Sequence, residues 1–300
     1  MKLWQKSDKF WLFFSLVSFA VLYLNLIWKT TADIDRLTTE SLFWIAILWL
    51  LWRRRDKLNL QSNLFSTCFG LALICLVLAK SFSLFWFESI LIPLIPIFLS
   101  FGLALIASGF KGLRQYWREL FFTWFLFFPE GVIGTVIDKF FRITVINAKL
   151  ASFVLHYVGF NVSSYSNHVV LDIPELGKFT ALVDYPCAGI PMIVLMLRIS
   201  LLLVAFFPLP KKEQILVPLV SLGIGFGLGV IRVCILTLLI SEKAKFDYWH
   251  GTGGSQIFST LAIVIFSFFC HSVVKKYDLF DSVQKSEAVK VAEVQNSGVQ

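Results

Sequence analysis

The stretch QILVPLVSLGIGFGLGVIRVCILTLLI, residues 214–240, holds 27 residues and a single charged side chain, that of Arg232. As an α-helix it would extend ~40 Å at 1.5 Å per residue, more than the ~30 Å hydrocarbon core of a bilayer. The whole chain has a matching composition, since 57% of its 300 residues are hydrophobic and 15% are charged. Such a chain has too little polar surface for a soluble globule. The sequence therefore predicts an all-α integral membrane protein.

Further apolar runs lie on both sides of this one and predict about eight transmembrane helices. The expected spans are residues 10–28, 38–52, 64–79, 86–109, 119–135, 188–207, 214–240 and 256–274. The first run is long for a signal-peptide core and no small-residue cleavage site follows it, so we expect an uncleaved anchor. We expect residues 1–280 to form one polytopic membrane domain. Residues 281–300 lack aromatic side chains and regular apolar spacing, which predicts a disordered cytoplasmic tail.

The net charge of +8 comes from short basic clusters between apolar runs, and this arrangement does not favour a nucleic-acid partner. In an eight-helix alternation all these clusters fall on one side, which the positive-inside bias assigns to the cytoplasm. We therefore expect a multi-pass protein of the inner (plasma) membrane with both termini cytoplasmic. The clusters are Lys2, Lys6 and Lys9; Arg53, Arg54, Arg55 and Lys57; Lys111, Arg114 and Arg118; Lys211 and Lys212; Lys275 and Lys276.

This topology places a long insertion, residues 136–186, on the outer (periplasmic) face. Its first part, residues 137–160, has apolar residues at helical spacing among charged ones, which predicts an amphipathic helix on the membrane surface. The runs HVVLDI (168–173) and KFTALVDY (178–185) flank the turn sequence PELG and predict a small β-hairpin. The hairpin leads directly into DYPCAGIPM.

The cysteines fall into two groups. Cys68, Cys75, Cys234 and Cys270 lie within apolar runs, where a cysteine acts as a small hydrophobic residue. Cys187 alone is expected at the outer aqueous boundary, without a second outer cysteine for a disulfide. An unpaired, exposed thiol is easily oxidised in such a compartment, so its presence suggests a functional role for Cys187.

The residues around Cys187 favour a thiolate. Pro191 should delay the helix to about residues 188–190, which places Cys187 at the helix N-terminus, where free amides and the dipole lower a thiol pKa. Ala188 and Gly189 leave room for a substrate backbone. The local sequence leaves two interpretations open, an attacking nucleophile or a small residue at a helix start.

Two other residues extend this site. Arg232 lies ~12 Å from the outer end of its helix, where a charge is costly and a functional role is the default. The alternative is a structural pair with Glu88 or Glu130. His250, in FDYWHGTGGSQIF, is expected in a short outer loop. Cysteine and histidine form a nucleophile and base for acyl transfer, and an arginine can stabilise the oxyanion. The outer-face histidines His156 and His168 are not excluded as the base.

The order of these residues resembles the exosortase/archaeosortase family of multi-pass membrane cysteine transpeptidases. The shared elements are PCAGI at the outer start of one helix, GVIR in the outer half of the next, and HGTGG before the last. The resemblance covers about residues 128–274. It departs from the family at Ala188, where Ser is frequent, and at Gly229, where Asn is frequent; the second change affects arginine positioning or substrate choice.

The resemblance implies a protein-sorting enzyme. Such enzymes cut a C-terminal signal of exported proteins, which consists of a PEP-CTERM-like motif, a transmembrane helix and a basic tail. The resemblance implies Cys187 as nucleophile, His250 as base and Arg232 as oxyanion stabiliser, with a thioester passed to an unidentified acceptor nucleophile. The residues expected to support substrate binding are Asp184, Ala188, Gly189 and Gly254.

Two other classes of function fit the same composition. A transporter or channel would use Arg232 to bind an anionic solute and the glycines for helix motion. A non-catalytic envelope assembly partner would not need Cys187, Arg232 or His250. No cofactor and no metal site are expected, because the outer His and Cys residues lack a compact ligand spacing.

Overall fold

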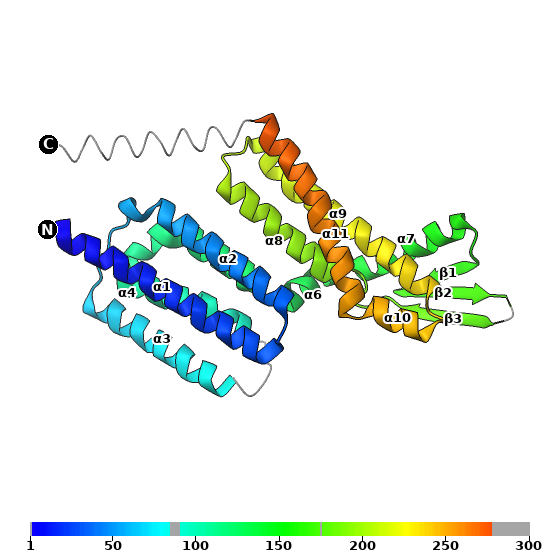
Figure 1. Cartoon of the computed structure of the whole chain (residues 1–300), viewed down its shortest axis with the longest axis horizontal. Coiled ribbons are helices and arrows are strands. Elements are labelled where there is room, and N and C mark those ends of the chain that lie inside the picture. The colour runs from blue at the N-terminus through cyan, green and yellow to red at the C-terminus, as the bar shows by residue number, and fades with distance from the viewer. Residues whose placement is uncertain (1, 85–90, 175, 278–300) are drawn as a thin grey trace. The chain divides into compact units, whose positions relative to one another are not determined.

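The computed structural model describes residues 2–84, 91–174 and 176–277 (Figure 1). Residue packing divides the chain into two compact units, Met1–Glu130 and Gly131–Gln300. The expectation of one polytopic domain over residues 1–280 stays a prediction. The predicted tail at 281–300 and the start of the predicted span 86–109 lie outside the described residues.

The first unit is built from α-helices and short 3-10 turns. Its elements are α1 (Lys2–Thr31), α2 (Ile34–Arg53), η1 (Arg55–Lys57), α3 (Leu64–Leu84), η2 (Ile92–Leu94), α4 (Ile95–Gly112), η3 (Leu113–Tyr116) and α5 (Trp117–Phe127). Asp33 caps α2, since its carboxylate accepts hydrogen bonds from the backbone amides of Asp35 and Arg36 in the first turn of the helix. α3 packs closely on α4, because a Cβ atom at Gly70 would meet the Gly102 carbonyl oxygen at 2.6 Å.

The chain folds back between α4 and α5. Gly109 has a φ of +67°, a left-handed conformation that favours glycine, and the 3-10 turn η3 follows. The Ser108 hydroxyl lies 2.8 Å from the Tyr116 hydroxyl, which ties the two sides of the fold-back together. As a result, residues of α4 and α5 line the same cavity.

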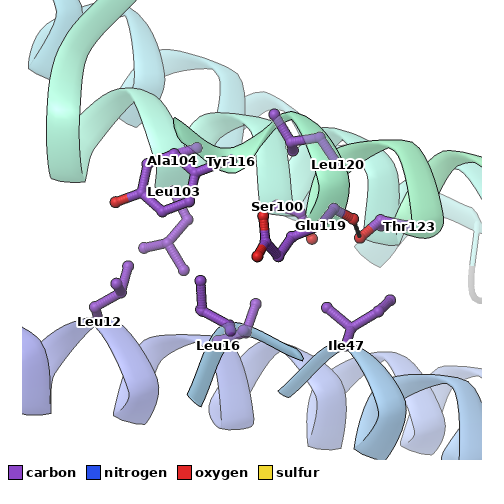
Figure 2. Close-up of a pocket in the computed structure, with 11 residues that line it drawn as sticks. Leu12, Leu16, Ile47, Ser100, Leu103, Ala104, Tyr116, Glu119, Leu120 and Thr123 are labelled. Atoms are coloured by element: carbon purple, nitrogen blue, oxygen red, sulfur yellow. Dashed lines mark hydrogen bonds between the residues drawn. The ribbon is translucent and has the colours of Figure 1, made fainter. Parts of the chain in front are cut away.

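That cavity contains a buried acidic residue (Figure 2). Glu119 is 6% exposed and accepts a hydrogen bond from the Arg54 guanidinium at 3.0 Å. The cavity is otherwise mostly apolar, so the ion pair supplies the partner that the carboxylate needs away from water. Its lining consists of Leu12, Leu16, Ile47, Leu51, Ser100, Leu103, Ala104, Tyr116, Glu119, Leu120 and Thr123.

The second unit contains six helices and three strands among its described residues. They are α6 (Glu130–Phe141), α7 (Ile143–Val158), β1 (Val162–Tyr165), β2 (His168–Ile173), β3 (Gly177–Leu182), α8 (Ile190–Phe206), α9 (Lys211–Leu238), α10 (Lys243–His250) and α11 (Thr252–Lys276). α8, α9 and α11 pack together, and α7 packs on α9. α9 begins where α11 ends, since the Tyr277 hydroxyl donates to Glu213 at 2.9 Å.

Five helical segments of the described chain are long and apolar enough to cross a bilayer, which makes this a multi-pass membrane protein. They are Lys9–Thr31, Leu64–Ser81, Ile92–Phe127, Lys211–Leu238 and Thr252–Lys276. The predicted count of eight stays a prediction. α8 is apolar but has only 17 residues, and the predicted span 119–135 is interrupted at Pro129, where α5 ends and α6 begins.

The insertion at residues 136–186 differs from its prediction in two ways. The single amphipathic helix expected over 137–160 is broken at Arg142, whose φ of +51° is left-handed. Asp138 stabilises the break, because its carboxylate accepts hydrogen bonds from the Thr144 amide at 2.8 Å and hydroxyl at 3.0 Å. The expected hairpin is confirmed as β2 and β3, and β1 adds a third antiparallel strand that was not predicted, in the order β1-β2-β3. The sequence of β1, VSSY, is short and polar and gives little strand signal.

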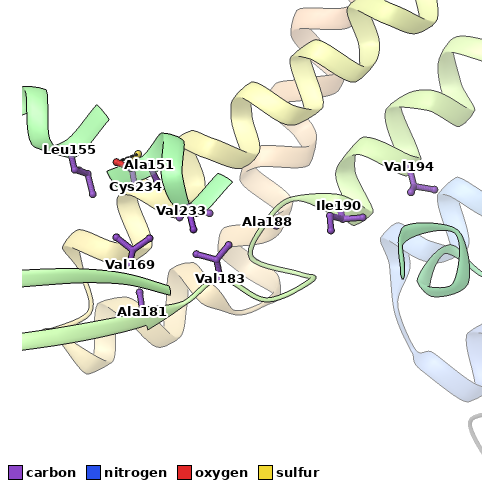
Figure 3. Packing of buried hydrophobic residues seen from close by; sticks show 11 residues of the cluster. Ala151, Leu155, Val169, Ala181, Val183, Ala188, Ile190, Val194, Val233 and Cys234 are labelled. Atoms are coloured by element: carbon purple, nitrogen blue, oxygen red, sulfur yellow. Dashed lines mark hydrogen bonds between the residues drawn. The ribbon is translucent and has the colours of Figure 1, made fainter. Parts of the chain in front are cut away.

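One of the buried hydrophobic clusters of the second unit holds the insertion against the helices (Figure 3). Small residues dominate it, which lets α7, the sheet and α9 approach closely. The core consists of Ala148, Ala151, Leu155, Val169, Ala181, Val183, Ala188, Ile190, Val194, Val233 and Cys234. The segment between β3 and α8 is fixed by this core at both of its ends.

Candidate active site

The turn from β3 to α8, residues 183–189, positions Cys187. The Val183 amide donates to the Asn167 carbonyl at 2.8 Å, and the Asp184 carboxylate accepts a hydrogen bond from the Cys187 amide at 3.1 Å. Gly189 has a φ of +70° and precedes α8, which begins at Ile190 as the sequence predicted. Cys187 therefore stands just before the helix, in a turn closed by Asp184.

The state of the Cys187 thiol differs from the prediction. The residue is 4% exposed, so the expected solvent-facing thiol is wrong. Burial raises the pKa of Cys187 to about 12, and the hydrogen bond and negative charge of Asp184 raise it further, whereas Arg232 acts in the opposite direction. The expected lowering of the pKa by the helix N-terminus is also wrong. The thiol is neutral near pH 7 and must give up its proton during any attack.

His250 lies beside this thiol. One donor atom each of Asp184, Cys187 and His250 lie within 4.8 Å of one another, although the residues come from the turn and from α10. The expected loop around His250 is the short helix α10, which ends at this residue. His156 and His168 contact Tyr157 and Tyr165 instead, with ring centroids 6.0 Å and 4.8 Å apart.

Arg232 joins the turn to α10. It is 5% exposed, and its Nη1 donates to the Pro186 carbonyl at 2.8 Å while its Nη2 donates to the His250 carbonyl at 3.1 Å. Its Nε has no hydrogen-bond partner among the described residues. The guanidinium is thus held by neutral carbonyls, and the alternative partner Glu88 lies outside the described residues.

The close approach of α9 to the turn depends on glycine. A Cβ atom at Gly229 would meet the Ala188 carbonyl oxygen at 2.7 Å, and one at Gly189 would meet the Gly229 Cα at 2.9 Å. The α9 glycines also pack closely at Gly225, where a Cβ atom would meet the Ile193 Cα at 3.1 Å, whereas a Cβ atom at Gly223 or Gly227 would meet nothing within 4 Å. Gly254 packs against the backbone of Trp249, beside His250.

Asn147 is a site residue that the sequence reasoning missed. It is fully buried on α7, and its Nδ2 donates to the Ala188 carbonyl at 2.7 Å. It stands in a segment read as a surface helix, where an Asn is ordinary. Its spacing with Thr144, Ala148 and Ala151, all on one face of α7, was the available signal.

A small cavity, with room for about one water molecule, lies against Cys187 on the side of the sheet. Its walls come from β3 and the residue after it, from α9 and from α10. The lining residues are Ala181, Leu182, Val183, Cys187, Val233, Leu236, Thr237 and Phe246.

The set of Asp184, Cys187 and His250 has two chemical uses. Thiolate, imidazole and carboxylate are zinc ligands, so the expectation that no compact ligand set exists is wrong. The same three groups can also serve acyl transfer: the Cys187 thiol as the nucleophile, the His250 imidazole as the proton acceptor, and the Asp184 carboxylate as an anion that orients or polarises the other two. Arg232 adds a positive charge next to this set.

A family model described as transmembrane exosortase matches residues 28–267. The chain belongs to the transmembrane exosortase family. The match includes the 183–189 turn, α9 and α10. It also covers residues 28–127 of this exosortase-family chain, where the sequence motifs do not occur. Comparison with curated proteins and with solved structures gives no match.

Proposed function

We propose that this exosortase-family protein is a membrane cysteine peptidase or transpeptidase that cuts C-terminal sorting signals of exported proteins. The observation that carries the proposal is the meeting of Cys187, His250 and Asp184, with donor atoms within 4.8 Å, next to a buried arginine. The family is one of transmembrane transpeptidases and proteases. The substrate class, with a PEP-CTERM-like motif, a transmembrane helix and a basic tail, follows from the family resemblance.

In the proposed reaction, the Cys187 sulfur attacks the scissile carbonyl carbon while His250 takes the thiol proton. This transfer must accompany the attack, because the raised pKa of Cys187 leaves little thiolate at neutral pH. The tetrahedral intermediate collapses as the C–N bond breaks and His250 returns the proton to the leaving amine. An acceptor amine or water then cleaves the resulting thioester.

Arg232 has two roles in this proposal. Its hydrogen bonds to the Pro186 and His250 carbonyls hold the nucleophile and the base in register. Its charge offsets the negative charge that develops on the sulfur and on the oxyanion, an effect that is strong in a water-poor site. Asn147 and Gly229 fix the turn from the other side.

The proposed orientation places this site on the outer face. The basic residues Lys211, Lys212, Lys275 and Lys276 lie at the opposite ends of α9 and α11 from Arg232 and His250. Cytoplasmic placement of these lysines follows the positive-inside bias. A membrane-tethered substrate would then present its sorting motif to the site after export.

The test is to co-express wild type or Cys187→Ala with a reporter that carries a candidate sorting signal from the same genome. We expect a shortened reporter in the membrane fraction with wild type and with Cys234→Ala, a buried cysteine control. Cleavage should be absent with Cys187→Ala at equal membrane abundance. Persistent cleavage with Cys187→Ala would contradict the proposal.

A further inference from the structure

The three groups that meet around Cys187 also have the composition of a metal site. One donor atom each of Asp184, Cys187 and His250 lie within 4.8 Å of one another. Some point therefore lies within ~2.8 Å of all three atoms, whereas zinc bonds to carboxylate, imidazole and thiolate ligands are ~2.0–2.3 Å long. Side-chain movements of less than ~1 Å close this difference. The set is close to coordination geometry without any change of fold.

The backbone already brings the ligands together. Asp184 and Cys187 are separated by two residues in one turn, a spacing that paired zinc ligands often have. His250 comes from the end of α10, and Arg232 joins it to the turn by donating to the carbonyls of Pro186 and His250. These hydrogen bonds use backbone carbonyls, so they do not occupy the imidazole or the carboxylate. The side chains of Asp184 and His250 also keep exposed surface, which gives an ion access from solvent.

The ligand chemistry favours a borderline-soft divalent ion such as Zn²⁺. Thiolate and imidazole ligands suit zinc, whereas magnesium and calcium prefer oxygen ligands. With its sulfur deprotonated, Cys187 supplies one negative charge and Asp184 a second, which together balance the charge of the ion. Arg232 adds a positive charge beside them, and the described residues supply three ligands, one fewer than a structural zinc site has. We therefore expect reversible rather than structural binding.

We infer that Asp184, Cys187 and His250 form a reversible Zn²⁺-binding site, and that the bound ion blocks the chemistry of Cys187. As the zinc–sulfur bond forms, the thiol proton passes to solvent, and the ion holds a lone pair of the sulfur and one of the imidazole. The nucleophile and the proton acceptor are then occupied together. The metal site does not depend on the proposed function, whereas the inhibition rests on it, because only an enzyme that uses Cys187 is inhibited in this way.

The first test follows the Cys187 thiol directly. The full-length protein in detergent is freed of metals and treated with iodoacetamide with or without Zn²⁺, and mass spectrometry measures alkylation of the peptide that contains Cys187. We expect Zn²⁺ at about ten times its dissociation constant to slow this alkylation roughly tenfold, and a chelator to restore the rate. Mg²⁺ should have no effect. An alkylation rate that stays unchanged throughout the Zn²⁺ titration would overturn the inference.

Two Asp→Asn variants separate the ligand set from a general effect of charge. Asp184→Asn removes the carboxylate ligand, so the Zn²⁺ concentration for half-protection should rise about tenfold or more, since loss even of a group that only supports a ligand costs ~10–100-fold in affinity. Asp247→Asn is the matched control, because Asp247 is an exposed carboxylate on α10 outside the set. Each variant is compared with itself without Zn²⁺, so a change in thiol reactivity does not enter. Equal shifts in the two variants would contradict the inference.

A spectroscopic test does not need alkylation. Co²⁺ occupies sites with nitrogen and sulfur ligands, and a bound thiolate gives a charge-transfer absorption band. We expect this band in wild type and in Cys234→Ala, and its loss in Cys187→Ala. A band of unchanged intensity in Cys187→Ala would show that the ion binds elsewhere and would overturn the inference.

Reporter cleavage separates this inference from the proposed function. Zn²⁺ that protects Cys187 from alkylation should also stop cleavage, and a chelator should restore it. Protection by Zn²⁺ without any reporter cleavage keeps the metal site and contradicts the sorting enzyme. Cleavage that needs Cys187 but continues under protecting Zn²⁺ keeps the enzyme and contradicts the inhibition. Cleavage that a chelator abolishes would also contradict the inhibition, because the reaction would then need the ion.

Discussion

Glu119 in the first unit and Arg232 in the second unit are both buried charged side chains, and the two are satisfied in different ways. In the first unit, Glu119 lies 3.0 Å from the Arg54 guanidinium, so the buried charge is neutralised by its partner. In the second unit, Arg232 donates to the carbonyls of Pro186 and His250, which are neutral. A charge held by carbonyls keeps its electrostatic effect on neighbouring groups. The Arg54–Glu119 ion pair is therefore suited to a structural role, whereas Arg232 is suited to a site where negative charge develops during a reaction.

The largest expected effect comes from removing the Arg232 charge. Arg232→Gln should lower the rate of reporter cleavage by about 10²–10³, the usual loss when a group that stabilises transition-state charge is removed. Arg232→Lys keeps the charge but cannot span two carbonyls as a guanidinium does, so we expect only partial activity. Both variants are compared with wild type by their rates of reporter cleavage at equal membrane abundance. Full activity of Arg232→Gln would reduce the residue to a packing role.

The second-largest expected loss of activity comes from disturbing the close contact between α9 and the 183–189 turn. Gly229→Ala places a Cβ atom 2.7 Å from the Ala188 carbonyl oxygen, which must displace the turn that carries Cys187. A displacement of this kind costs on the order of 10²-fold in rate.

Gly227→Ala is the control on the same helix, because a Cβ atom there meets nothing within 4 Å. Reporter cleavage by Gly227→Ala should equal that of wild type. Equal losses in the two variants would mean that the helix, not its contact with the turn, is sensitive.

The pH dependence of Cys187 alkylation tests the electrostatics of the site. In the folded protein, burial and Asp184 raise the pKa to about 12, so the iodoacetamide rate should rise about tenfold per pH unit from pH 7 toward that value. Asp184→Asn removes the negative charge and lowers the pKa, so its rate at pH 8 should be roughly tenfold higher or more. An unchanged profile would show that Asp184 does not act on the thiol.

The same pKa has a consequence for stability. The folded-state value lies above the unfolded value of ~8.5, so the neutral thiol contributes full stability below pH 8 and loses it as the pH rises toward 12.

The ion pair in the first unit should have the smallest effect on catalysis. Glu119→Gln leaves Arg54 without its carboxylate, and because Arg54 is 33% exposed we expect a loss of about 1–3 kcal/mol of unfolding free energy. Thermal unfolding in detergent measures this loss. Cleavage per folded molecule should stay within about twofold, and a large loss would mean that the first unit takes part in the reaction.

The sequence predicted those features that depend on residue type and order along the chain. Apolar runs located the five described helical segments that are long enough to cross a bilayer, and the Pro191 position located the start of α8 at Ile190. Order and sidedness also selected Cys187, Arg232 and His250, which the structure brings together. The roles of these residues in catalysis stay predictions.

Features that depend on packing could not be read from the sequence. The burial of Cys187 comes from contacts with α9 and α10, so its raised pKa opposes the local helix-terminus effect. Asn147 stands 40 residues before the nucleophile in an ordinary amphipathic segment, and only the fold places its amide on Ala188. The strand β1 is four residues long and polar, and it forms because β2 offers it an edge.

The most direct test of the central claim is to trap the acyl-enzyme. The full-length protein is incubated with the reporter and digested, and the peptide that contains Cys187 is measured by mass spectrometry before and after hydroxylamine treatment. We predict a substrate fragment on the Cys187 sulfur that hydroxylamine removes, as expected for a thioester. Reporter cleavage without such an adduct, or with the adduct on another residue, would contradict the account.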